Sequence, residues 1–297
     1  MVYVDLAPPG AFSPLSFELP PNSGPPVMLE YVEAIATARR LDDVWDLHCR
    51  TMAEFGFDRV IYGLTRVVGV NGSLGDADDA LVLSNHDRAY NDAFIGERMF
   101  LDAPGMRWAQ ENAGVIGWGD LWKDPRALTA PERRVVAFHK SMNVIAGFTV
   151  SIPHNNTRTF AMASLTGRPD LSQADLDAIW AIEGRKIWTM INVMHLKVLS
   201  LPHRGLGSDL SNRQREALEW VGDGKSYQDI AAIMGVSMAT VEKHLRLARE
   251  KLRVATTAQA LMKAAFQNQI YTVRGSGLCC PNRGPGVAPA TKSLTET

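Results

Sequence analysis

Three helix-start signals follow one another closely near the end of the chain, and they constrain the fold more than any other feature. Ser211, Ser226 and Ser237 each precede a run with the apolar spacing of a helix, as N-cap residues do. Gly235 stands between the second and third runs, where a sharp connection between helices requires a positive φ. A fourth apolar run at 257–267 completes a small helical unit. This order predicts a helix-turn-helix.

The third helix of this unit concentrates positive charge. Residues 237–253 contain five basic and two acidic residues, whereas the whole chain has a net charge of −1. Helical spacing places Val241 and Leu245 on the buried face and leaves a polar face that fits a major groove. A basic helix alone is more often a solvated surface, but its place after two capped helices and a glycine turn favours binding to DNA.

The same stretch resembles the GerE/LuxR-type DNA-binding domain. The resemblance rests on Leu-Ser-x-Arg-x-x-Glu-x-Leu at 210–218, Gly-Lys at 224–225 and Thr-Val-Glu-Lys-His-Leu at 240–245, with one departure at Leu247, where the family has Asn. It implies base reading by Glu242, Lys243 and Arg246. It also implies phosphate contacts by Ser237, Thr240 and Arg249. The expected partners are a palindromic operator in double-stranded DNA, a second copy of the chain and RNA polymerase.

The 297 residues suffice for two separate cores. Residues 1–28 are rich in proline, which disfavours helices and central strands, and they predict an extended flexible arm. The polar, glycine-containing stretch 202–210 predicts a linker. We therefore expect a first, regulatory domain over 29–201, a DNA-binding domain over 211–273 and a flexible tail over 274–297.

The first domain mixes helical and strand periodicity. Helical runs cover 41–55 and 172–201, and a helix with a capping box begins at Thr129. Strand-like runs occupy 59–68, 80–84, 146–153 and 157–165, the last two forming a hairpin. The order predicts an α+β fold: an N-terminal α-β-α sandwich around an antiparallel sheet, with a C-terminal four-helix helix-turn-helix domain. A phosphoacceptor receiver would need alternating strands and helices, but 31–57 predicts one uninterrupted helix.

Catalytic and metal chemistry have no support in the residue pattern. The seven histidines show no metal-ligand spacing, and no glycine-rich phosphate loop or Ser/His/Asp set stands out, so we expect neither an enzyme nor a metal site. The three cysteines do not form a disulfide framework, no apolar run is long enough to span a membrane, and the N-terminus lacks a secretory signal. We expect a cytoplasmic protein.

Residues 41–201 resemble the autoinducer-binding domain of LuxR-type quorum-sensing regulators. The resemblance rests on the runs at 57–63, 101–104 and 146–153 and on Trp-Gly-Asp at 118–120. It implies a transcriptional regulator that holds a small amphipathic signal, such as an acyl-homoserine lactone, in an apolar pocket. In that family a carboxylate accepts the ligand's amide N–H, while Tyr and Trp side chains donate to its carbonyl groups.

Several residues depart from the family's ligand-binding set. Ala103 stands at the carboxylate position and Asp102 one residue earlier; the three aromatic positions carry His86, Tyr90 and Phe94. The expected ligand-binding residues are His86, Tyr90, Phe94, Asp102, Trp118 and Ser164. Three alternatives stay open: an acyl-homoserine lactone held by Asp102, another small amphipathic ligand, or a regulator that needs no ligand. If Asp102 does not bind the ligand, we expect it to cap the helix that begins at Pro104.

Overall fold

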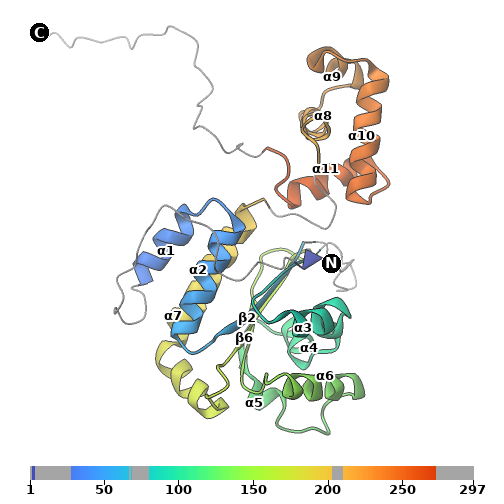
Figure 1. The fold of residues 1–297 in the computed structure, drawn as a ribbon. Coiled ribbons are helices and arrows are strands. Elements are labelled where there is room, and N and C mark those ends of the chain that lie inside the picture. Colours follow the sequence, from blue (N-terminus) through green and yellow to red (C-terminus); the bar gives the residue numbers. More distant parts are fainter. Residues whose placement is uncertain (1, 4–27, 67, 69–79, 203–209, 272–297) are drawn as a thin grey trace, which may run out of the picture.

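The computed structural model describes residues 2–3, 28–66, 68, 80–202 and 210–271. Most of the expected arm, linker and tail therefore lies outside the described residues, as do Cys279 and Cys280. Figure 1 shows a layered unit that contains the sheet and, beside it, a smaller unit made of helices.

A six-stranded sheet forms the middle layer of the first unit, with the strand order β1-β3-β2-β6-β5-β4. The strands are β1 (Val2–Tyr3), β2 (Arg59–Thr65), β3 (Leu81–Ser84), β4 (Gly114–Gly117), β5 (Gly147–Ile152) and β6 (Phe160–Thr166). All neighbours pair antiparallel except β1 and β3, which are parallel. The short β1 lies within the stretch that we expected to be an arm, and it occupies one edge of the sheet.

Helices cover both faces of the sheet (Figure 1). One face carries α1 (Met28–Thr37), α2 (Leu41–Glu54) and α7 (Gln173–Ser200). The other carries shorter elements: α3 (Arg88–Asn91), a π-helical turn (Asp92–Gly96), a 3-10 turn (Met99–Asp102), α4 (Pro104–Glu111), α5 (Trp118–Leu121) and α6 (Ala130–Ser141). Thr129 and Glu132 form the predicted capping box of α6. The predicted α+β sandwich is confirmed.

The two faces of the strands pack against different layers, because alternate side chains point to opposite sides of a sheet. On β2, Val60, Tyr62 and Leu64 are buried in the large core beneath α1, α2 and α7. The residues between them, among them Ile61 and Gly63, face the shorter helices. The thick helical layer therefore closes one face fully, while the shorter elements cover the other.

One helix prediction was wrong. Residues 31–57 do not form a single helix, because α1 ends at Thr37 and α2 begins at Leu41. Arg40 adopts extended backbone (φ −122°, ψ 145°) and is the N-cap of α2. Both α1 and α2 pack on α7 as separate helices. Apolar spacing continues across the break, so periodicity alone did not reveal it.

The smaller unit has the four predicted helices: α8 (Asn212–Gly222), α9 (Tyr227–Met234), α10 (Met238–Leu252) and α11 (Thr257–Phe266). Ser211, Ser226 and Ser237 cap the first three, each through its hydroxyl. Gly235 ends α9 in the left-handed region with φ +66°, as the tight turn required. Its core is separate from that of the sheet unit and is formed by apolar residues of all four helices.

The two units contact one another through the end of β2. Arg66, which directly follows that strand, donates to the carbonyl oxygens of Leu199 (2.7 Å) and Phe266 (2.6 Å). Asn268 donates from Nδ2 to the carbonyl oxygens of Leu199 (2.8 Å) and Leu201 (2.9 Å). A guanidinium at the C-terminal ends of two helices is electrostatically favourable. These bonds join α7 and α11, one helix from each unit.

Candidate ligand cavity and nucleic-acid interface

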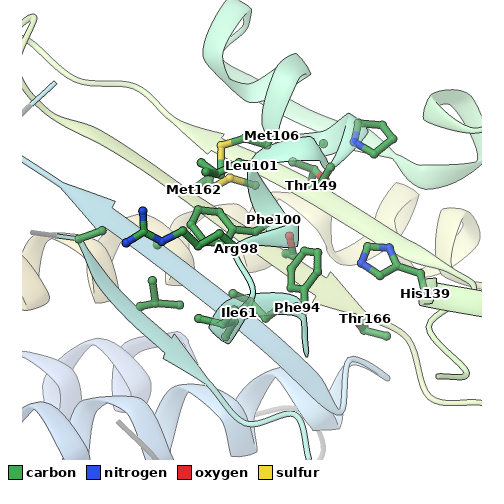
Figure 2. A pocket seen from close by; sticks show the side chains of 18 of the residues that line it. Ile61, Phe94, Arg98, Phe100, Leu101, Met106, His139, Thr149, Met162 and Thr166 are labelled. Carbon is green, nitrogen blue, oxygen red and sulfur yellow. The ribbon is translucent and has the colours of Figure 1, made fainter. Parts of the chain in front are cut away.

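A cavity of about 220 Å³ lies between the sheet and the shorter helices. Its walls are mostly apolar, and they come from the face of the sheet opposite the large core and from the elements between α3 and α6. Figure 2 shows side chains from these elements converging on it, with Phe94 and Phe100 at its centre and His139 entering from one side. A concave, mostly apolar pocket with a few polar groups is the usual form of a small-molecule site.

The sheet contributes small, hydroxyl and larger apolar side chains to the cavity. Gly63 of β2 pairs with Met162 of β6, and Thr149 of β5 pairs with Ser164 of β6. All four residues line the cavity. A Cβ built on Gly63 meets nothing within 4 Å, so the missing side chain at this position leaves open space. A larger residue in the middle of β2 would occupy that space.

Two hydrogen-bonded pairs provide polar atoms in the cavity wall. Trp118 donates from Nε1 to Oγ1 of Thr149 over 3.0 Å, and the hydroxyl of Tyr90 lies 3.1 Å from Nε2 of His139. Burial lowers the pKa of His139 to about 4, so its ring is neutral at neutral pH. Gly105 lets α4 approach this corner, because a Cβ there would lie 2.5 Å from the Thr149 hydroxyl.

Four of the six expected ligand-binding residues line the cavity: Tyr90, Phe94, Trp118 and Ser164. Asp102 does not line it; the residue is exposed at the end of the 3-10 turn. Asp102 is not the cap of α4 either, since the N-cap is Ala103, without a side-chain hydrogen bond. Arg98 precedes this turn with a left-handed backbone (φ +62°). Residue spacing in the sequence does not predict this conformation, so the direction of the Asp102 side chain could not be inferred from it.

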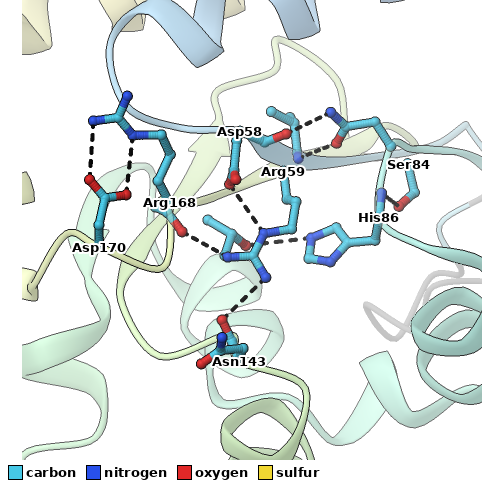
Figure 3. Close-up of polar contacts among 11 residues, drawn as sticks. Asp58, Arg59, Ser84, His86, Asn143, Arg168 and Asp170 are labelled. Carbon is cyan, nitrogen blue, oxygen red and sulfur yellow. Dashed lines mark hydrogen bonds and ion pairs between the residues drawn. The ribbon is translucent and has the colours of Figure 1, made fainter. Parts of the chain in front are cut away.

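His86 lies behind the cavity wall rather than in it. Its ring stacks on Tyr90 with 4.1 Å between centroids, and its Nε2 lies 3.5 Å from Oγ1 of Thr166. Figure 3 shows His86 beside Arg59, which donates to the carbonyl oxygens of Asn143 and Gly167. Burial lowers the pKa of His86 to about 3. The residue therefore supports Tyr90 from behind as a neutral ring.

The sequence did not point to three cavity residues that the structure brings in: Gly63, His139 and Thr149. His139 lies on the same face of α6 as Glu132, Val135 and Val136, all buried. A histidine at a buried position of an amphipathic helix was the available signal. Among the lining residues, all of them in the described part of the chain, Arg98 is the one charged side chain and none is a carboxylate.

Helix α10 presents a polar face to solvent. Its buried face consists of Val241, Leu245, Ala248 and Leu252, each fully enclosed. Glu242, Lys243 and Arg246 are exposed on the opposite side. Because these three lie on one side of a rigid helix, they can enter a major groove together.

The other expected DNA-contacting residues also have structural roles. Ser237 accepts from the backbone N–H of Thr240 over 3.2 Å and so caps α10 at the end where a phosphate would approach. Arg249 is half-buried and donates from a terminal guanidinium nitrogen to Oγ1 of Thr257 over 2.9 Å, which ties α10 to α11.

Comparison with protein-family models gives two matches. Residues 40–198 match the autoinducer binding domain, and residues 208–264 match the bacterial regulatory proteins of the luxR family. The chain belongs to the LuxR-type family of autoinducer-binding regulators. It is therefore a transcriptional regulator and not an enzyme, and its first domain is of the kind that takes a small-molecule signal, as the sequence predicted.

Relatives of this LuxR-type chain are distant in sequence. The transcriptional activator protein LuxR of Aliivibrio fischeri is 24% identical over 192 residues, which is 65% of this chain and 76% of that protein. The activator AnoR of Acinetobacter nosocomialis is 22% identical over 252 residues, 80% and 96% of the two chains. The crystal structure of Escherichia coli SdiA aligns at 15% identity and a TM-score of 0.43, covering 82% and 98%.

Among the residues that the structure describes, no group of three or more His, Cys, Asp or Glu side chains is placed to hold a metal ion. No helix among them combines the length and the apolar character that crossing a membrane requires.

Proposed function

We propose that this LuxR-type regulator binds a small amphipathic molecule in the cavity between the sheet and α3 to α6, and that the bound molecule controls binding to DNA. The observation that carries the proposal is the cavity itself: about 220 Å³, mostly apolar, with hydrogen-bonded Trp118–Thr149 and Tyr90–His139 pairs in its wall. Apolar walls suit an alkyl chain, and a few fixed polar groups suit one polar head.

In this proposal Tyr90 and Trp118 contact the polar head, Phe94 contacts the chain, and Ser164 contributes a hydroxyl from the sheet. His86 holds Tyr90 in place by stacking on it. Asp102 has no such role, because it is exposed and outside the cavity wall. An acyl-homoserine lactone remains a candidate ligand, but no carboxylate of the cavity wall would accept its amide N–H. The alternative is a regulator that needs no ligand, and it would leave cavity substitutions without effect on DNA binding.

At the DNA, we propose that Glu242, Lys243 and Arg246 read base edges, while Ser237, Thr240 and Arg249 contact phosphates. A bound dimer would place two α10 helices in successive turns of the major groove, about 34 Å apart, on a palindromic operator. RNA polymerase is the further partner that regulation of transcription implies.

Tyr90→Phe is expected to reduce the response to the ligand several-fold, because it removes the hydroxyl that pairs with His139. Asp102→Asn is expected to change the response less than about twofold, as is usual for an exposed side chain. The measurement is an operator-fused reporter titrated with an organic extract of the native bacterium's culture medium. A large loss in Asp102→Asn, with Tyr90→Phe unaffected, would contradict this assignment of the site.

Light scattering at micromolar concentration is expected to report a dimer. Large apolar side chains are exposed on α7, with Ile182 at 78% and Leu196 at 64%, and on α11, with Met262 at 54%. We assign these side chains to the dimer interface, because association would remove their apolar surface from water. Ile182→Lys should weaken the dimer, whereas Ile145→Lys, outside both helices, should not. A monomer that occupied a whole palindrome with one protomer would rule out this arrangement.

A further inference from the structure

The cavity offers the polar end of a ligand no carboxylate. None of its lining residues, which all lie in the described part of the chain, is Asp or Glu. An amide N–H that enters an apolar cavity without an acceptor loses its hydrogen bond to water and gains nothing in exchange. The cavity wall therefore offers an amide N–H only neutral acceptors such as the Ser164 hydroxyl, and its other polar groups are free to recognise another feature of the ligand.

His139 is a polar residue of the wall with unused hydrogen-bonding capacity. Its side chain is 7% exposed, and its Nδ1 is buried without a hydrogen-bond partner in the structure. Five aromatic rings surround it: Tyr90, Phe94, Trp118, Trp122 and Phe138. A buried nitrogen without a partner is uncommon in proteins, and such a group calls for an explanation. Figure 2 shows the ring directed toward Phe94 and the cavity.

The pair with Tyr90 determines what the free nitrogen can do. The hydroxyl of Tyr90 lies 3.1 Å from Nε2, and a neutral imidazole carries one proton on one of its two nitrogens. When Tyr90 donates to Nε2, the ring proton is on Nδ1, and Nδ1 is a donor. The ring of His139 lines the cavity, so the polar group of a bound ligand comes close to it.

Thr149 adds a second donor nearby. Its Oγ1 already accepts the indole N–H of Trp118 over 3.0 Å, which leaves the hydroxyl proton available. Both residues line the cavity. Two donors in an apolar enclosure are matched by a ligand group that accepts, such as a carbonyl oxygen.

We propose that His139 is a ligand-binding residue that donates from Nδ1 to a carbonyl oxygen, and that the ligand is an uncharged alkyl lactone, ester or ketone that needs no amide N–H. This inference rests on the proposed function, because it assumes that the cavity is the signal site. It assigns recognition of the polar head to a neutral imidazole on α6, a residue outside the ligand-binding set that the sequence predicted.

Two compounds separate an amide-reading site from a carbonyl-reading site. N-octanoyl-homoserine lactone and γ-dodecalactone share a lactone ring and an alkyl tail of similar length, but only the first has an amide N–H. Isothermal titration of the full-length protein with each compound gives the two affinities. We expect γ-dodecalactone to bind at least as tightly as the homoserine lactone, since the amide finds no carboxylate acceptor in the wall.

Variants of His139 test the residue itself. His139→Leu is expected to weaken γ-dodecalactone binding roughly three- to tenfold, the value of one net hydrogen bond. His139→Asn, whose amide nitrogen falls near the position of Nδ1, is expected to retain most of the affinity. Asp102→Asn is the matched control and should leave both affinities unchanged. Melting temperatures of the unliganded variants verify that each one folds; if His139→Leu does not, the affinities of the two compounds for the wild-type protein still decide whether the site reads an amide or a carbonyl group.

Two results would overturn the inference. Tighter binding of the homoserine lactone by tenfold or more, lost in Asp102→Asn, would show that a carboxylate reads an amide after all, and the proposed function would stand. Binding of neither compound to the wild-type protein would also refute the proposed ligand class. Failure of the proposed function would give a different result: the reporter response to the ligand would be unchanged in Gly63→Leu, whose side chain fills the cavity.

Discussion

We expect Arg246→Ala to weaken operator binding by about 1–3 kcal/mol, which is roughly five- to 150-fold in affinity. Arg246 is exposed on the polar face of α10, and its guanidinium lies 2.5 Å from Oε1 of Glu250, one turn along the same helix. An exposed pair of this kind contributes little to stability. In a major groove the guanidinium would exchange the ion pair with Glu250 for two hydrogen bonds to one guanine, which contribute far more free energy to binding.

Fluorescence anisotropy with labelled DNA measures this loss, on the operator and on a scrambled sequence of equal length. If Arg246 reads a base, the loss on the operator exceeds the loss on scrambled DNA, whereas a phosphate contact weakens both alike. Arg126→Ala is the matched control, because Arg126 is also exposed and paired, with Asp124 at 3.1 Å, but lies in the sheet unit. Equal operator affinity for Arg246→Ala and wild type would show that the recognition face is elsewhere.

Gly63→Leu is expected to abolish the response to the ligand while the protein stays folded. Gly63 lines the cavity in the middle of β2, and a Cβ there meets nothing within 4 Å, so the isobutyl group has room to enter the cavity. Gly63→Ala adds a single methyl group and should lower the response only in part. Leucine also buries apolar surface and replaces glycine in a strand, so we expect an unchanged or higher melting temperature.

The reporter assay with culture extract, together with thermal unfolding followed by circular dichroism, checks both parts of this prediction. Loss of the response in a variant that melts at or above the wild-type temperature separates a filled cavity from an unfolded domain. A full response in folded Gly63→Leu would mean that the signal binds elsewhere or that no signal is needed.

The helical unit could be predicted almost completely because its determinants are local. A cap hydroxyl such as that of Ser211 or Ser226 bonds a backbone N–H three residues later, and Gly235 supplies the left-handed turn by itself. Strand alternation likewise predicted the hairpin of β5 and β6 to within a few residues. In each case the physical cause lies within a few positions of its effect.

The cavity depends on contacts between distant residues, and for this reason less of it could be predicted. The family resemblance placed Ala103 at the carboxylate position and so brought attention to Asp102 beside it, but the turn that follows Arg98 leaves that side chain exposed. His139 enters the cavity wall through a pair with Tyr90, 49 residues away in the sequence. Gly63 matters for the space that it leaves, which only the packing of three strands and the helices above them reveals.

Native mass spectrometry of the protein isolated from the bacterium that naturally produces it tests the central claim most directly. Wild-type protein purified with its operator is predicted to carry one small amphipathic molecule per chain, and extraction should identify that molecule as an uncharged carbonyl compound. Gly63→Leu prepared in the same way is predicted to carry none. Wild-type protein that binds its operator fully, with no bound molecule on any chain, would contradict control by a ligand in this cavity.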